Sequence, residues 1–573
     1  MENRDIARIF NEIADILEIT GGNPYKVRAY SRAARNIEDL SKRIEDICRE
    51  DKKALREIPG VGEAIAKKIE EIIKTGKLKK HQQLLKKVPP ELLELMQITG
   101  IGPRHLKLLK EKLGVKNTAD LEIVCKQHRV QDLEGFGEKT EKKILDALGD
   151  FKHSKGRMKL DQAKEYATSI IQYLKEQDKN INTVETAGSL RRGLETIGDL
   201  DILVASKDSK KVMDSFVSYP EVKTILSKGN TKSSIILKSG FQVDLRDIKK
   251  QKLGSALIYF TGSKAHNIHI RKIAKADGLK INEYGVFRRK KNIASKTEED
   301  VYKTVGLKYI LPELREDRGE IEAASKDKLP NVIELKDIKG DLHMHTRASD
   351  GAHTIADMVI AASQKNYEYV AITEHSKGLK IAGGLNEKEL ARHIKKIDKE
   401  DKKIKGIRIL KGIEVDIKDN GKLDLSDSIL KELDIVIAAI HTKFNMNKTE
   451  MTERILKAFD NKYVNILAHP TGRLIGKRKP YEIDFEKIFK VAKKRNIMME
   501  LNCFPNRLDL KDIHCKMAKD IGVKIIISTD AHSKQQLNNM EYGVITARRG
   551  WLEDADVLNT FKFNKFIKGI KRT

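Results

Sequence analysis

Seven short apolar runs between Lys339 and Arg549 constrain the fold of this chain more than any other feature of its sequence. The segments between them are compatible with helices. Continuous apolar runs that alternate with helices are typical of a parallel sheet whose two faces are both covered. The sequence therefore predicts an α/β barrel in this region. The runs lie at 340–345, 369–375, 409–414, 435–441, 464–469, 497–502 and 525–529.

Nearly all of these runs end in side chains that can bind metal ions. The carboxyl ends of parallel strands meet at one mouth of a barrel, so we expect these side chains to converge there. Imidazole and carboxylate ligands without thiolate suit Mn, Zn or Fe, and nine of them are enough for two or three ions. One buried histidine is usually a core residue, but nine such groups would be very costly to desolvate as core residues. The predicted ligands are His343, His345, Asp350, His375, Glu414, His441, His469, Asp530 and His532.

This pattern resembles the PHP phosphoesterase domain, whose nine-ligand set is complete here. The resemblance implies a distorted seven-stranded barrel that hydrolyses phosphoesters through a metal-activated water. PHP enzymes include histidinol phosphatases, so the domain alone does not name the substrate. Arg473, which closes the matching stretch 469–473, is either a ligand of the substrate phosphate or a surface arginine.

A second motif, from Gly188 to Val204, predicts a phosphate-binding turn that runs into a metal-binding strand. Gly188 and Ser189 let the backbone approach an anion, and two arginines follow at 191 and 192. Residues two apart on a strand point to the same side, so Asp199 and Asp201 converge. The alternate residues Leu200, Ile202 and Val204 are expected to face the core.

A third carboxylate, Asp244, lies on a predicted hairpin formed by 234–237 and 241–245 around the turn 238–240. Three carboxylates beside a phosphate-binding turn predict two-metal phosphoryl transfer, with Asp199, Asp201 and Asp244 as catalytic ligands. An isolated Asp-x-Asp is more often a solvated strand face. The upstream turn and the downstream Asp244 favour the metal site here.

This second motif resembles the palm of family X DNA polymerases, and the stretch Tyr259 to Ser263 is similar to the sugar-selecting turn of that family. The resemblance implies Mg²⁺ or Mn²⁺ at the carboxylates and dNTPs as substrates. It also places Arg271 at the position that faces the template strand in that family. The aromatic pair 259–260 either excludes ribonucleotides or packs the thumb. The nucleotide contacts that it implies are Gly188, Ser189, Arg191, Arg192, Gly198, Tyr259, Phe260, Gly262 and Asn267.

Three Gly-x-Gly turns repeat in the first 150 residues, which have helical periodicity almost throughout. Each turn precedes an amphipathic helix that carries lysines, so its free backbone N–H groups can bind a phosphate without reading a base. The turns resemble helix-hairpin-helix motifs, and the resemblance adds a monovalent cation at their carbonyls. The glycines expected to contact DNA are Gly60, Gly62, Gly100, Gly102, Gly135 and Gly137.

The first 80 or so residues resemble the small N-terminal domain of family X polymerases. The resemblance implies that Lys26 and Tyr30, on the segment 25–30, bind a DNA 5′-phosphate. Lys68 falls at the position of a Schiff-base lysine in those members that are lyases. Lys68 is therefore either a DNA-binding nucleophile or a solvated helix lysine, since sequence does not show whether its pKa is depressed.

The composition fits a nucleic-acid partner. The net charge is +28, which favours a polyanion, although a Lys-rich proteome would give the same balance. The four cysteines have no Cys-x-x-Cys spacing, which fits a reducing cytoplasm and excludes a disulfide framework. There is no apolar run of about 18 residues, so we expect no membrane segment. We expect a cytoplasmic monomer, and the sequence leaves its repair partners unknown.

These patterns predict a multidomain chain: a helical small domain at 1–82, helix-hairpin-helix fingers at 83–157, a nucleotidyltransferase palm at 158–250, a thumb at 251–317, a linker at 318–337 and the PHP domain at 338–573. The N-terminal region is expected to be all-α, the palm and thumb α+β, and the last domain α/β. A charged stretch from Arg315 to Pro330 marks the expected domain boundary.

The predicted function is gap filling on primed or gapped DNA during repair, with a PHP 3′ to 5′ exonuclease. Abasic-site incision and 3′-end cleaning remain open as further activities of that site. Two alternatives remain. In one, the PHP domain is a small-molecule phosphatase or a scaffold beside an active polymerase. In the other, the protein is a non-catalytic DNA-end tether.

Overall fold

The computed structural model describes residues 3–38, 44–50, 55–56, 58, 60–86, 88–98, 101–154, 157–179, 181 and 183–570. The chain forms two compact units. One consists of residues 1–155 with 475–479, and the other of 156–474 with 480–573.

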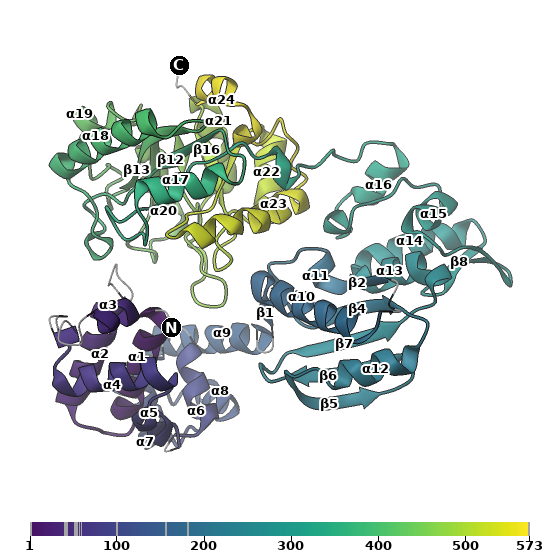
Figure 1. The fold of residues 1–573 in the computed structure, drawn as a ribbon, viewed down its shortest axis with the longest axis horizontal. Helices are drawn as coiled ribbons and strands as arrows, with labels where there is room; N and C mark the ends of the chain where they lie inside the picture. Colours follow the sequence, from purple (N-terminus) through teal and green to yellow (C-terminus); the bar gives the residue numbers. More distant parts are fainter. Residues whose placement is uncertain are drawn as a thin grey trace. The chain divides into compact units, whose positions relative to one another are not determined.

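The N-terminal unit is helical, as its periodicity predicts (Figure 1). In α1 the residues Ile6, Phe10 and Ile13 are fully buried, and the ring of Phe10 packs 5.8 Å from that of Tyr30 on α2. A single apolar core is continuous through the unit. The helices are α1 (Asn3–Ile19), α2 (Pro24–Glu38), α3 (Ile44–Glu50), α4 (Glu63–Thr75), α5 (Lys79–Leu85), α6 (Pro90–Glu94), α7 (Pro103–Leu113), α8 (Thr118–Lys126) and α9 (Glu138–Ser154).

The palm is a five-stranded sheet in the order β2-β4-β7-β6-β5. Strands β4 and β7 are parallel and the other pairs antiparallel, and β6 with β7 forms the predicted hairpin. On β4 the residues Leu200, Ile202 and Val204 are fully buried, as predicted, and Leu203 and Ala205 are buried as well. The elements are β1 (Met158–Lys159), α10 (Leu160–Gln177), β2 (Thr183–Thr186), α11 (Gly188–Arg191), β3 (Thr196–Ile197), β4 (Leu200–Ala205), α12 (Ser209–Val217), β5 (Val222–Lys228), β6 (Lys232–Leu237) and β7 (Gln242–Asp247).

The thumb follows as helices beside a three-stranded antiparallel sheet of order β10-β9-β8. Its elements are α13 (Leu253–Thr261), α14 (Lys264–Ala276), β8 (Leu279–Asn282), β9 (Gly285–Arg288), β10 (Lys291–Ala294) and α15 (Glu298–Thr304).

The charged stretch after the thumb is structured, which differs from the expectation of a linker from Arg315 to Pro330. It contains helix α16 (Glu320–Ser325), and Arg315 and Glu320 are fully buried. Arg315 pairs with Glu298 at 2.7 Å, and Glu320 with His266 at 2.7 Å. A stretch this rich in charged residues resembles a linker when only the sequence is considered. In the structure its charges are neutralised by residues distant in sequence, which the local pattern does not show.

The C-terminal domain contains the seven predicted strands, all parallel and in chain order. A bridge between Met344 and Ala531 joins the ends of the first and last strands, so the sheet is a nearly closed barrel. The strands are β11 (Gly340–Asp341), β12 (Tyr369–Ile372), β13 (Arg408–Asp416), β14 (Ile435–Ala439), β15 (Ile466–Leu467), β16 (Met498–Asn502) and β17 (Ile525–Ser528).

Strand residues alternate between two apolar cores. On β14, Ile435 and Ile437 face a core inside the barrel, whereas Val436 and Ala438 belong to the layer beneath the helices. Helices lie around the strands (Figure 1). They are α17 (Ile355–Ser363), α18 (Glu387–Lys403), α19 (Asp427–Leu430), α20 (Lys448–Ala458), α21 (Phe485–Arg495), α22 (Asp512–Ile521), α23 (Met540–Arg549) and α24 (Phe563–Gly569).

Within the described residues, none of the helices combines the length and the apolar character needed to cross a bilayer.

Candidate active sites

Two carboxylates of the palm lie on neighbouring strands. Asp201 on β4 is in register with Asp244 on β7, and Asp199 precedes β4 in an exposed position. Burial, and then the negative charges of Asp199 and Asp244, raise the pKa of Asp201 to about 6. Mutual repulsion of this kind fits a site that binds divalent cations, which would neutralise it.

The palm carboxylates are nevertheless more dispersed than a closed metal site. Among the described residues, the groups with three potential ligand atoms within 4.8 Å of one another all lie in the C-terminal barrel. In the palm, Gln242 Nε2 donates to Asp244 at 3.0 Å, and Lys232 lies 3.6 Å from the same carboxylate.

The turn before β4 requires glycine at its first position. Gly188 has φ +59°, and a Cβ added there would lie 2.5 Å from Oδ2 of Asp201. Ser189 follows in the short helix α11. A Cβ at Gly198 would lie 2.9 Å from Arg157 Nη1. The predicted phosphate turn and the predicted metal ligands are therefore in direct van der Waals contact.

The two arginines of the turn have carboxylate partners that the sequence analysis did not identify. Arg191 makes a two-point contact with Glu298 of α15, at 2.8 and 2.6 Å. Arg192 Nε donates to Glu316 at 3.0 Å, and its Nη1 donates to the carbonyl of Thr261. Arg191 thus joins palm to thumb. Glu298 and Glu316 have no local pattern that would mark them.

The predicted sugar-selecting turn lies at the end of α13. The rings of Tyr259 and Phe260 stack edge to face at 5.0 Å, and Tyr259 is 39% exposed. Asn267 donates to the Tyr259 carbonyl at 2.8 Å, and Arg271 donates to the Asn267 carbonyl at 2.9 Å while its side chain is exposed. Gly262 has φ +70° and lies against Arg192. The side chains of Asn267 and Arg271 thus bind backbone carbonyls at the end of α13 and within α14.

The barrel brings all nine predicted metal ligands to the carboxyl ends of its strands. Glu414 on β13 lies at the centre, 2.7 Å from His375 Nδ1 and 3.0 Å from His469 Nε2. His441 and His343 approach the same carboxylate at 3.4 and 3.5 Å. Several imidazoles therefore surround one carboxylate that is almost completely buried.

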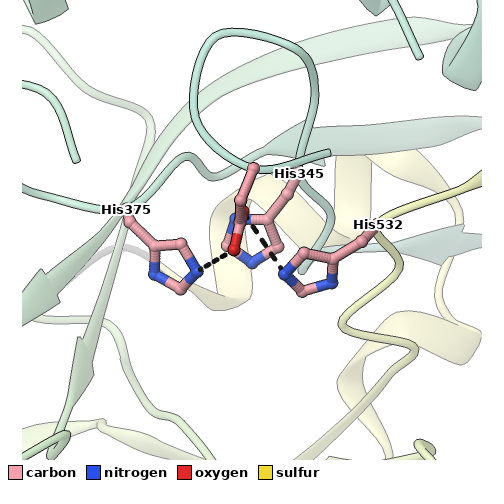
Figure 2. Close-up of side chains that lie close together, drawn as sticks. His345, His375 and His532 are labelled. Atoms are coloured by element: carbon pink, nitrogen blue, oxygen red, sulfur yellow. Dashed lines mark ion pairs between the residues drawn. The ribbon is translucent and has the colours of Figure 1, made fainter. Parts of the chain in front are cut away.

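Two more carboxylates complete the cluster. Asp530 lies 3.2 Å from His345 and 3.6 Å from His343. Asp350 lies 3.5 Å from His375 and 3.4 Å from His532. Figure 2 shows His345, His375 and His532 converging, with dashed lines for the two pairs to Asp350. Of the three compact groups of potential ligands, the one with Asp350 shares His345 with the group of Asp530 and His375 with the group of Glu414.

The buried ring nitrogens without partners and the carboxylates of this cluster fit bound cations. Nε2 of His343 and both ring nitrogens of His345 are buried without a hydrogen-bond partner among the described residues. Burial, then the positive His375 and His532, lower the pKa of His345 to about 4. Burial would also lower the pKa of His375, but Glu414 and Asp350 raise it to about 10. Buried imidazoles that face carboxylates with unused lone pairs are suited to hold divalent metal ions.

An outer layer of carboxylates orients these ligands, and the sequence analysis missed it. Glu500 on β16 accepts from Nδ1 of His343 at 2.6 Å and from the backbone N–H of His469 at 2.6 Å. Asp416 lies 2.6 Å from Nδ1 of His441. Such partners fix the ring orientation of a metal-bound histidine. Position at the end of a strand run was the one signal that could have indicated them.

Arg473 is engaged away from the nine ligands. Its guanidinium donates to the Leu508 carbonyl and pairs with Glu195 of the palm at 2.8 Å. Arg473 is buried and paired with a partly exposed Glu195, so it is not a surface arginine, and its binding of a substrate phosphate stays a prediction.

The Gly-x-Gly turns of the N-terminal unit share one geometry. The middle N–H donates to the carbonyl three residues earlier in each: Val61 to Ile58, Ile101 to Ile98 and Phe136 to Leu133. No side chain caps α4 or α7 at its N-terminal glycine. A Cβ at Gly62, Gly102, Gly135 or Gly137 would meet nothing within 4 Å, and Gly60 has φ +82°. Gly100 lies outside the described residues.

Three predicted DNA-binding side chains lie near one another in this unit. Tyr30 is 8% exposed, and Nζ of Lys68 lies 5.9 Å above its ring. Lys68 donates to the Ala64 carbonyl at 2.8 Å. Partial burial, with further contributions from Lys26 and Lys80, lowers the pKa of Lys68. Tyr30 therefore packs in the core, whereas Lys26 and Lys68 form a positive surface.

Family models match five consecutive parts of the chain. They are a helix-hairpin-helix domain at 1–78, a SAM-like helix-hairpin-helix tandem at 92–150, a DNA polymerase beta palm at 157–242, a DNA polymerase beta thumb at 256–316 and a PHP domain at 341–503.

Curated relatives fall into two kinds. A DNA polymerase/3′-5′ exonuclease PolX of Bacillus subtilis (strain 168) is 40% identical over 576 residues, which is 100% of both chains. A probable phosphatase of Thermoanaerobacter sp. (strain X514) is 32% identical over 245 residues, 40% of this chain and 95% of its own. A probable phosphatase of Acetivibrio thermocellus is 33% identical over 245 residues, 40% of this chain and 94% of its own.

Proposed function

Because this chain belongs to the family X DNA polymerases that carry a C-terminal PHP domain, we propose that it fills short gaps in DNA during repair and trims 3′ ends with its PHP domain. The observation that carries the proposal is the presence of two separate sites. Asp201 and Asp244 lie in register beside the Gly188 turn, and nine potential metal ligands lie at the barrel mouth.

In the palm, Asp199, Asp201 and Asp244 are the residues that would hold two Mg²⁺ or Mn²⁺ ions. Such ions lower the pKa of a primer 3′-hydroxyl and neutralise the triphosphate. Backbone N–H groups of the Gly188 turn and the guanidinium of Arg192 bind the terminal phosphates of a dNTP. Tyr259, Phe260 and Asn267 line the pocket for the sugar of the dNTP. Gly198 and Gly262 let the backbone approach the nucleotide, and Arg271 faces the template strand.

Arg191 has a different role in this proposal. Its two-point pairing with buried Glu298 uses the guanidinium for a palm–thumb contact. We assign it to holding the turn in place instead of binding phosphate directly.

In the PHP domain the nine ligands would hold two or three ions, with Mn²⁺ favoured over Zn²⁺ or Fe. Such ions supply a hydroxide nucleophile near neutral pH and stabilise the leaving oxygen. The protein contributes ring orientation through Glu500 and Asp416, and it excludes bulk water from Glu414. Abasic-site incision and 3′-end cleaning are chemically equivalent uses of the same site.

The N-terminal unit is the DNA anchor in this proposal. The uncapped helix N-termini at Gly62 and Gly102 would bind backbone phosphates, and a monovalent cation would sit on the hairpin carbonyls. Lys26 and Lys68 would bind the 5′-phosphate of a gap. We also propose that the protein is a monomer. Its domains are divided after residues 82, 157, 250, 317 and 337.

A small-molecule phosphatase is the rival function for the barrel, because relatives named as probable phosphatases align with this part of the chain. Turnover with Mn²⁺ on a 3′-recessed DNA end and on small phosphomonoesters separates the two. Faster turnover of the small substrate favours the phosphatase.

The decisive experiment uses a labelled one-nucleotide gap with Mn²⁺, with and without dNTPs. We expect extension with dNTPs and 3′ shortening without them. Asp199→Ala should abolish extension alone, and His343→Ala should abolish shortening alone. Loss of both activities in one folded variant would contradict two independent sites, and extension without shortening would leave the barrel to a phosphatase or a scaffold.

A further inference from the structure

The phosphate turn of the palm is capped by an arginine of the barrel domain. Helix α11 spans only four residues, and its C-terminal cap is Arg192, with φ −78° and ψ −3°. Nη1 of Arg549, the last residue of α23, donates to the Arg192 carbonyl at 2.6 Å. The last carbonyls of a helix lack partners within it, and a cation there also complements the helix dipole. Arg549 thus satisfies a helix end that α11 cannot satisfy itself.

The same arginine shares a carboxylate with the side chain of Arg192. Glu316 Oε1 accepts from Arg192 Nε at 3.0 Å and from Arg549 Nη1 at 3.0 Å. Nη2 of Arg549 donates to Asp512 at 2.8 Å. All four side chains are at most 15% exposed, so solvent screens these contacts only weakly. Arg549 therefore fixes both the backbone of Arg192 and the partner of its guanidinium.

Close packing accompanies these hydrogen bonds. Gly193 follows the cap with φ +66°, and a Cβ added there would lie 2.2 Å from Cγ2 of Ile545 on α23. The turn therefore fits against this barrel helix only because the residue has no side chain.

The fixed arginine retains a free donor. Nε and Nη1 of Arg192 are used by Glu316 and by the Thr261 carbonyl, whereas Nη2 has no hydrogen-bond partner in the part of the chain that is described. A guanidinium held at two of its three nitrogens presents the N–H groups of the third in a fixed direction, as recognition of a phosphate requires.

We propose that Arg549, a residue of the PHP domain, is a positioning residue for nucleotide binding at the palm. It caps α11 and holds Glu316, and through both contacts it orients Arg192 toward the triphosphate. This inference rests on the proposed polymerase function. It assigns the barrel a second role, independent of its predicted metal ligands: through α23 it holds the phosphate turn of the polymerase site in position.

The test compares full-length Arg549→Gln with Arg548→Gln in single-nucleotide gap filling. Arg548 is the matched control, since it lies on the same helix and contacts Glu313 at 2.7 Å and the Ile333 carbonyl at 3.0 Å instead of Arg192. Arg549→Gln should raise the KM for dNTP about tenfold, the loss expected for a charge-assisted contact, with kcat changed less than about twofold. Arg548→Gln should leave KM within about twofold.

Hydrolysis at the PHP site and the thermal unfolding midpoint report folding for each variant. Arg549→Lys, which keeps the charge but loses the planar fork of donors, should give an intermediate KM and serves if the glutamine variant does not fold. Equal KM values for the 548 and 549 variants, or an unchanged KM in Arg549→Gln, would overturn the inference. Absence of incorporation by the unaltered protein would instead refute the polymerase function itself.

Discussion

The Asp201 carboxylate is flanked by Asp199 and Asp244 on a partly buried strand, and this environment defines its chemistry. A site that concentrates negative charge without a cation is destabilised, and the same charge becomes useful when a cation binds. We therefore expect substitution of Asp201 to affect catalysis more than stability.

Asp201→Asn should reduce nucleotide incorporation by about 10²- to 10³-fold, the range for losing one group that stabilises transition-state charge. Steady-state incorporation on a primed template measures the effect. Asp247→Asn is the matched control, because Asp247 ends β7 in the same sheet and binds Ser206 at 2.6 Å. Equal losses in the two variants would mean that the carboxylate acts only through the sheet.

Glu500 contacts two of the predicted metal ligands, His343 through its ring and His469 through its backbone N–H. Glu500→Gln should weaken Mn²⁺ binding by about 10- to 100-fold, as loss of an outer-shell partner does. Calorimetric titration of the metal-free protein with Mn²⁺ measures this directly. Glu486→Gln, at an exposed pair with Lys490 on α21, should leave the affinity unchanged. An unaltered affinity in Glu500→Gln would remove its role.

At the scale of elements, strand ends and turns place the functional groups. β4 and β7 pair directly as parallel neighbours although α12, β5 and β6 separate them in the chain, so two carboxylates 43 positions apart come into register. In the barrel, seven parallel strands deliver their C-terminal residues to one mouth. The alternation and the apolar runs predicted these elements correctly because both are local properties of the chain.

The phosphate turn gives a prediction at this scale. Gly188→Ala should lower incorporation at least about tenfold, since its Cβ would lie 2.5 Å from the Asp201 carboxylate at φ +59°. Gly240→Ala isolates the backbone effect, because Gly240 also has a positive φ, +84°, but open space around its Cβ. Similar losses for both would show that strain, and not contact with Asp201, is responsible.

At the scale of the whole molecule, a buried ion network links palm and thumb. Burial alone would raise the pKa of Glu298, but Arg191 and Arg315 lower it to about 2. A depressed pKa means that the contribution to stability is present above the ordinary value of 4.5 and is lost as pH falls toward 2. The difference between 4.5 and about 2 corresponds to about 3 kcal/mol.

Glu298→Gln imitates the protonated side chain, so it should destabilise the protein by about 3 kcal/mol at pH 7 and progressively less as pH falls from 5 to 3. Urea unfolding of both proteins at several pH values measures the difference. A destabilisation that stays constant over this window would show that Glu298 is not held ionised by the arginines.

The sequence by itself determined the strands, and it placed the Asp-x-Asp pair where a strand begins and nine potential metal ligands at or after strand ends, where their role as ligands stays a prediction. Each of these depends on neighbours within a few residues, where backbone geometry fixes the direction of a side chain. The amino-acid sequence also indicated the order of the domain types along the chain, because each motif has its own local pattern.

Only the tertiary structure decided which charges meet. Arg192 and Arg549 are 357 residues apart, and Glu500 lies 157 residues from His343. Arg315 begins a charged stretch that resembles a linker in sequence, yet its side chain is buried in the thumb. No local periodicity encodes such pairs, because they arise when separately folded sheets and helices pack and their buried charges must be neutralised. Local motifs in the sequence indicate which side chains are suited to the chemistry. The packing of the domains determines which other residues hold those side chains in position.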